Sequence, residues 1–129
     1  MTVWTRAAAT LFLATFASGA AQAQTAEPFY KGKTIELIIG YPTGGSNDVY
    51  ARLLSTHLGK HLPGNPSVVA RNMPGAGSFL AANHMTSVAP KDGTSIALCA
   101  PTIALDEKLG TAGVRFKTAQ MNWIEIGRA

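Results

Sequence analysis

A glycine-rich loop at residues 40–48, with the sequence GYPTGGSND, carries the residue types best suited to holding a ligand. The loop lies between an apolar run at residues 34–39 and an amphipathic stretch at residues 49–62. A strand, a glycine turn and the start of a helix, in this order, place free backbone N–H groups at the positive end of a helix dipole. The loop therefore predicts a binding site for an anion.

The residues of this loop are suited to different roles. Gly44 and Gly45 permit positive φ angles and a close approach of the backbone to a ligand. Ser46 or Asn47 can cap the following helix. Asp48 lies in its first turn, where a carboxylate complements the helix dipole but repels a nearby anion. We therefore interpret Asp48 as a structural cap rather than a ligand contact. The alternative for the whole loop is a plain strand-to-helix connection whose glycines serve turn geometry only.

No other motif predicts a catalytic, cofactor or metal site. The tripeptide GKT at residues 32–34 precedes the apolar run instead of following it, so it does not form a P-loop, and no GxGxxG pattern follows the run. His57 and His61 are four residues apart but lack a third ligand, which favours a solvated helix face. Ser46 lacks the GxSxG frame of a hydrolase nucleophile. Cys99, the only cysteine, is expected to be a small buried hydrophobe.

The elements that must position the loop alternate between strands and helices. We expect the strand at residues 34–39 to be buried on both faces, because it is almost continuously apolar. Helical spacing of the apolar residues predicts an amphipathic first helix, with Val49, Leu53, Leu54, Leu58 and Leu62 on one side. The predicted strands are residues 34–39, 67–71 and 94–99, and the predicted helices are residues 49–62 and 79–88.

This alternation predicts an α/β fold with a parallel sheet, flanking helices and right-handed crossovers. Ligands bind such sheets outside the carboxyl ends of the strands. The loops after residues 39, 71 and 99 are therefore expected to lie on one edge of the sheet. The loop after residue 71 is also rich in glycine.

The first 23 residues are interpreted as a secretory signal peptide. Arg6 is the only charged residue before Glu27, residues 7–17 are mostly apolar, and residues 21–23 form a small-x-small cleavage signal. The apolar run is shorter than the roughly 20 residues that a membrane anchor needs. We expect residues 24–129 to be exported, without membrane insertion of the mature chain.

Composition narrows the class of partner. Without Arg6, the eleven Lys and Arg residues of the chain become ten against seven Asp and Glu, a mild net charge of +3. The positive residues are spread along the chain without a dense cluster, so nucleic-acid binding is not expected. The mature length fits one small domain.

Three segments follow one another in a family-like order and spacing. They are residues 41–52 (YPTGGSNDVYAR), 71–77 (RNMPGAG) and 89–94 (APKDGT). Together they resemble the Bug family, the extracytoplasmic solute receptors of tripartite tricarboxylate transporters, whose patterns are close to FPPGGxxDxxAR, NRPGAG and APDGYT. The likeness continues through residues 102–105 and reaches residues 123–124.

The resemblance implies a periplasmic receptor that is not an enzyme and needs no cofactor. Its fold would be a two-lobed clamshell of the periplasmic-binding-protein type, which encloses a small carboxylate and hands it to a membrane permease. The resemblance assigns ligand contacts to Tyr41, Pro42, Thr43, Gly44, Gly45, Ser46, Ala100, Pro101 and Thr102. The residue types themselves favour capping and turn roles for Asp48, Pro74, Gly75, Gly77, Asp92 and Gly93.

The chain departs from the family pattern in four places. Thr43 replaces a common second proline and adds a hydroxyl, Pro101 removes an N–H group, and Asp106 and Glu107 stand where Asn-Pro is usual. Family members are also much longer than this chain. We therefore expect residues 24–129 to be an N-terminal lobe truncated before the second lobe, with a strand at residues 123–126 leading toward it.

Two other functions remain open at this stage. The chain can be the N-terminal fragment of a secreted α/β enzyme whose catalytic residues lie downstream. It can also be a lone lobe that serves as an interaction module, or a nonfunctional remnant.

Overall fold

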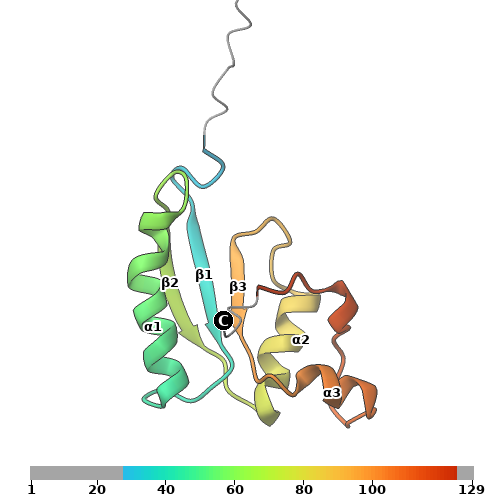
Figure 1. Cartoon of the computed structure of the whole chain (residues 1–129). Helices are drawn as coiled ribbons and strands as arrows, with labels where there is room; N and C mark the ends of the chain where they lie inside the picture. Colours follow the sequence, from blue (N-terminus) through green and yellow to red (C-terminus); the bar gives the residue numbers. More distant parts are fainter. Residues whose placement is uncertain (1–27, 125–129) are drawn as a thin grey trace, which may run out of the picture.

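The computed structural model describes residues 28–124, in which three parallel strands form one sheet of order β2-β1-β3 (Figure 1). The predicted α/β class and parallel sheet are confirmed, and each strand lies within one residue of its predicted bounds. The predicted signal peptide at residues 1–23 lies outside the described residues. The strands are β1 Thr34–Ile39, β2 Ser67–Asn72 and β3 Ser95–Leu98.

β1 is the central strand and is buried on both faces, as its apolar sequence predicts. It pairs in parallel with β2 on one side and with β3 on the other. Side chains alternate between the two faces of a strand, so Ile35, Leu37 and Ile39 share one face and Ile38 lies on the other. All four are at most 1% exposed.

Helices connect the strands and cover the sheet. Because the chain runs from β1 to β2 and then back past β1 to β3, right-handed crossovers place the two connecting helices on opposite faces. Ala51 of the first helix packs with Leu37 and Ile39, whereas Phe79 and Ala82 of the second belong to a separate core cluster. The helices are α1 Ser46–Leu58, α2 Phe79–Ser87 and α3 Ile103–Lys108, with short 3-10 turns at Gly59–His61, Ala76–Ser78 and Thr118–Gln120.

The apolar residues predicted at helical spacing in the first helix do not all turn toward the sheet. Leu58 at the end of α1 and Leu62 beyond it are half-buried. Val49 and Leu53 are 61% and 56% exposed, and Leu54 is exposed as well. Asp48 and Ala51 are the buried residues of α1. The small side chain of Ala51 lets the helix approach β1 closely, and the hydrogen bonds of Asp48 described below fix the rotation of the helix about its axis.

The segment that follows α3 folds back onto α2. The side-chain amide of Asn83 donates to the carbonyl of Gly113 at 3.0 Å, and its oxygen accepts from Arg115 N at 2.8 Å. These bonds hold the segment so that Phe116, 1% exposed, lies in an edge-on contact with Phe79.

The end of the chain yields no strand within the described residues. Trp123 and Ile124 lie outside any strand, and residues 125–126 fall beyond the described part. Between residues 28 and 124, none of the helices combines the length and the apolarity needed to cross a bilayer.

Candidate functional site

The loops that follow the three strands meet at one edge of the sheet, at the carboxyl ends of β1, β2 and β3 (Figure 1). In an open sheet of this order, the connections from β1 and β3 diverge, which makes a switch point between these two strands. Ligands of doubly wound sheets bind in the crevice at such a point. The candidate site therefore comprises the loops at residues 40–45, 73–78 and 99–102.

Hydrogen bonds tie the three loops together. Ser78 Oγ donates to the Gly40 carbonyl at 3.0 Å and accepts from Ala100 N at 3.1 Å. Asn72 Nδ2 donates to the Tyr41 carbonyl at 3.1 Å. Tyr41 and Ala100 are thus held by Asn72 and Ser78, two residues for which the sequence predicted no role in the site.

Asp48 is the electrostatic centre of the first loop. It is 3% exposed, and Oδ2 accepts from Gly44 N at 2.9 Å. Arg52 Nε lies 3.1 Å from both carboxylate oxygens, and Asn72 Nδ2 donates to Oδ1 at 2.8 Å. The hydrogen bond from Gly44, followed by those from Arg52 and Asn72, lowers the pKa of Asp48 to about 2. The carboxylate is therefore charged and directed inward, and Arg52 offsets its charge.

The donors of the first loop differ in part from those expected. Gly44, which needs its glycine because φ is 87°, gives its N–H to Asp48 and so does not offer it to a ligand. The N-cap of α1 is Gly45 with φ −80°, and no side chain caps the helix. The predicted caps Ser46 and Asn47 are wrong, because both lie inside the first turn. Their backbone N–H groups are left facing the edge where the helix dipole is positive.

Three aliphatic hydroxyls at this edge make no hydrogen bond within residues 28–124: those of Thr43, Ser46 and Thr102. All three side chains are exposed. In the third loop, Ala100 gives its N–H to Ser78 and Pro101 has none. Thr102, the N-cap residue of α3, is therefore the polar residue that the third loop presents.

Tyr41 and Cys99, which follow β1 and β3, pack against different core clusters. Tyr41 is half-buried and packs against the cluster of Leu37 and Ile39. Burial raises the pKa of Tyr41, with a further contribution from Cys99. Burial also raises the pKa of Cys99 to about 11, so the thiol stays protonated. Cys99 is half-buried against the second core cluster, which agrees with a hydrophobic role.

The predicted turn residues occupy two ends of the sheet. Pro74, Gly75 and Gly77 lie in the loop after β2, with φ of 148° at Gly75 and 61° at Gly77. Asp92 and Gly93 precede β3 and so lie at the opposite edge. There, Asp92 Oδ1 accepts from the hydroxyl and the N–H of Thr94, which lowers the pKa of Asp92.

A metal centre finds no support between residues 28 and 124, where no group of three or more His, Cys, Asp or Glu could hold an ion. His57 and His61 are both exposed. His57 Nδ1 lies 2.9 Å from the Leu53 carbonyl of its own helix.

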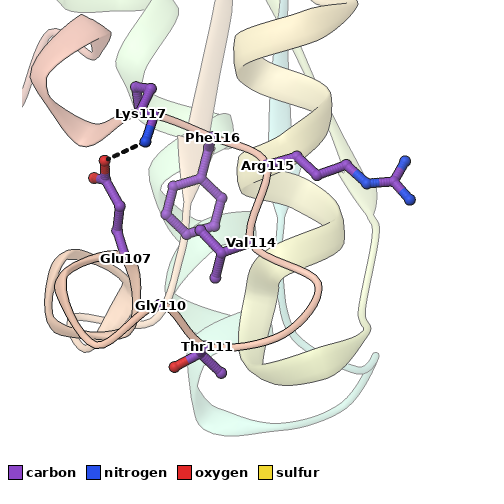
Figure 2. A pocket seen from close by; sticks show the side chains of 7 residues that line it. All are labelled: Glu107, Gly110, Thr111, Val114, Arg115, Phe116 and Lys117. Atoms are coloured by element: carbon purple, nitrogen blue, oxygen red, sulfur yellow. Dashed lines mark ion pairs between the residues drawn. The ribbon is translucent and has the colours of Figure 1, made fainter.

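A hollow of about 170 Å³ lies away from the three loops, beside α3. Figure 2 shows Glu107 and Lys117 facing each other, with their ion pair at 3.6 Å, while Arg115 points away from them. The two cations therefore do not converge on one anion. The hollow is lined by Glu107, Gly110, Thr111, Val114, Arg115, Phe116 and Lys117.

Comparison with known proteins gives one relative with a clear similarity. The chain is similar to a UPF0065 protein. This relative, from Cupriavidus necator, is described as "UPF0065 protein in gbd 5'region" and is 44% identical over 77 residues. The matched stretch makes up 60% of this chain and 22% of the relative. UPF0065 is the family that includes the Bug proteins. No protein-family model matches the chain.

Proposed function

We propose that this chain is a solute-binding lobe of the Bug type, which takes a small carboxylate at the edge formed by its three loops. The observation that carries the proposal is the meeting of these loops at the switch point of the sheet, beside the open first turn of α1. The similarity to a UPF0065 protein supports it.

The chemistry of the edge suits a carboxylate bound by neutral donors. The proposed donors are the N–H groups of Ser46 and Asn47 and the hydroxyls of Thr43, Ser46 and Thr102. Donors at a helix N-terminus bind anions without a basic side chain. Asp48 does not oppose this binding, because its charge is directed toward Arg52 and Asn72.

In this proposal the protein binds and delivers its ligand and does not transform it. It works in the periplasm, needs no cofactor, and passes the carboxylate to the membrane permease of a tripartite tricarboxylate-type transporter. A second lobe would supply the opposite wall of the site. The edge of this lobe holds the ligand by itself, but more weakly, because it buries less of the ligand's surface.

Calorimetric titration of the full chain tests the proposal against citrate, succinate, an aromatic acid and an amino acid. We expect at least one carboxylate to bind. Ser46→Ala should weaken that binding about three- to tenfold, the worth of one net hydrogen bond. The control is Thr56→Ala, which removes a hydroxyl that bonds within α1 to the Leu53 carbonyl. Absence of binding by every compound, or equal binding by Ser46→Ala, contradicts the proposal.

The exposed apolar side of α1 favours a second candidate function, an interaction module. Val49, Tyr50 and Leu53 are all more than half exposed on this helix, and such residues mark interaction surfaces when they are contiguous. Sedimentation of the full chain across concentrations, with and without citrate, separates the two. A dimer that dissociates in Leu53→Lys, and whose formation does not depend on citrate, favours the interaction module.

A further inference from the structure

The hydrogen-bond ladder between β1 and β3 stops one rung short. Glu36 N donates to the Thr94 carbonyl at 2.8 Å, and Gly40 N donates to the Leu98 carbonyl at 2.9 Å in the same register. In a parallel ladder of this register, the next bond would run from Ala100 N to the Gly40 carbonyl.

The hydroxyl of Ser78 occupies the place of that missing bond. Ala100 N donates to Ser78 Oγ at 3.1 Å, and Ser78 Oγ donates to the Gly40 carbonyl at 3.0 Å. A hydroxyl can accept and donate at once, so both backbone groups are satisfied while the two strands are held one hydroxyl further apart.

We propose that Ser78 is a positioning residue that inserts its hydroxyl into the β1–β3 ladder and so sets the width of the ligand edge. The loop after β1 and the loop after β3 begin to part at this residue. Ser78 therefore sets the distance between the donors of the two loops, including Ser46 and Thr102. The consequence for a carboxylate rests on the proposed function, whereas the effect on the strands does not.

The backbone around Ser78 adopts a strained conformation that a simple loop between β2 and α2 does not require. Ser78 has φ 75° and ψ 6°, and it follows Ala76 and Gly77 with φ of 45° and 61°. Two of these three left-handed residues carry a Cβ, which makes the conformation costly. Strain of this kind persists where the surroundings over-determine it, and it gathers at functional sites.

The packing of Ser78 shows how tightly its hydroxyl is placed. Ser78 is 1% exposed, and a Cβ added at Gly40 would lie 2.6 Å from Ser78 Oγ. A glycine at position 40 is therefore the partner that lets the hydroxyl reach the backbone of β1.

Two substitutions in the full chain separate the hydroxyl from the backbone strain. Ser78→Ala removes the hydroxyl and keeps the Cβ, and Ser78→Gly removes both and relieves the left-handed strain. The matched controls are Ser55→Ala and Ser55→Gly, because Ser55 Oγ donates to the Arg52 carbonyl within α1 and touches none of the three loops.

Amide hydrogen exchange followed by NMR gives a readout that needs no ligand. We expect the Ala100 amide of Ser78→Ala to exchange at least tenfold faster than in the parent chain, because it loses its acceptor. In Ser78→Gly we expect Ala100 to bond directly to Gly40, with retained protection and shifted amide signals at residues 41–46. Unchanged Ala100 exchange in Ser78→Ala, or unshifted loop signals in Ser78→Gly, overturns the proposal.

Citrate titration of the same variants tests the consequence for the ligand. If the parent chain binds citrate, Ser78→Gly should raise the dissociation constant at least tenfold while its thermal midpoint stays at or above that of the parent. Equal affinity in Ser78→Gly overturns the positioning role. Absence of binding by the parent chain counts against the proposed carboxylate function, and the exchange experiment then decides the role of Ser78 alone.

Discussion

Asp48 shows how a carboxylate can lie beside an anion site without opposing it. Its oxygens accept hydrogen bonds from Gly44, Arg52 and Asn72, and 3% of the residue is exposed. The charge therefore connects the first loop, α1 and the end of β2. The place of Asp48 in the first turn of a helix predicted its structural role at the start of α1. The hydrogen bond from Asn72 was not predictable, because it depends on the pairing of β1 with β2.

Replacement of Asp48 by Asn should lower stability in a way that depends on pH. The pKa of Asp48 falls from 3.8 to about 2 on folding, so the charged carboxylate stabilises the chain above its ordinary pKa. That stabilisation is lost as the pH falls from about 4 to about 2. We expect the urea midpoint of Asp48→Asn to lie below that of the parent at about pH 7 and to approach it near pH 2.

The control for this measurement is Asp106→Asn. Asp106 accepts one long side-chain hydrogen bond, from Thr111 at 3.4 Å. A difference between parent and Asp48→Asn that stays constant across the pH range would contradict the charged role of Asp48.

Two glycines of the first loop should respond differently to alanine. A Cβ at Gly40 would meet Ser78 Oγ at 2.6 Å, whereas a Cβ at Gly45 would have Pro42 O at 3.8 Å as its nearest atom. Overpacking of this kind costs about 1–3 kcal/mol. We expect chemical denaturation to show this loss in Gly40→Ala and little change in Gly45→Ala. Ser78→Gly should recover part of the loss in Gly40→Ala, and additive effects of the two changes would be inconsistent with their contact.

At the scale of elements, the strands were predictable and the faces of α1 were not. β-branched and apolar runs bounded by Gly and Pro define β1 and β2 to within one residue. The leucines of α1 fit a helical period, but the buried side is decided by Ala51 and by the contacts of Asp48 with residues outside the helix. α3 was missed because six residues are too few to show a period, although Asp106, Lys108 and Gly110 mark its ends.

The observed orientation of α1 predicts contrasting effects at two of its positions. Leu53→Lys should change the free energy of unfolding by less than about 0.5 kcal/mol, because the side chain is already exposed. Ala51→Leu should destabilise the chain by about 1–3 kcal/mol, because Ala51 is packed against Leu37 and Ile39. Thermal unfolding of the two variants measures both effects. The reverse order would mean that the leucines face the core.

At the scale of the whole molecule, two hydrophobic core clusters lie on opposite faces of the sheet, and β1 separates them. The cluster beneath α1 joins Leu37 and Ile39 of β1 to Ala51 of α1. The other is completed by Phe116, which reaches it because Asn83 holds the segment after α3. Sequence predicted the three loops of the candidate site, since all follow strands. It did not predict the bonds of Ser78, because these join residues 22 and 38 positions away in the chain.

Loss of the Asn83 contacts should expose the second cluster. Cys99 packs against this cluster, and burial raises its thiol pKa to about 11, so its reaction with a thiol reagent near pH 8 should be slow. Asn83→Ala removes two hydrogen bonds, worth about 1–2 kcal/mol together, and should speed the reaction about tenfold. Asn47→Ala, on the other face of the sheet, is the control. Equal rates for Asn83→Ala and the parent would mean that the segment stays in place without Asn83.

The left-handed turn at Ala76–Ser78 restricts which amino-acid substitutions this sequence can accept during evolution. Position 40 can gain a methyl group only after position 78 has lost its side chain, so the order of the two replacements is constrained. Threonine keeps a hydroxyl at position 78 but is β-branched and poorly tolerated at positive φ. Among descendants of this gene, glycine at 40 with serine at 78 should thus be inherited as a pair, and alanine at 40 should occur with glycine at 78.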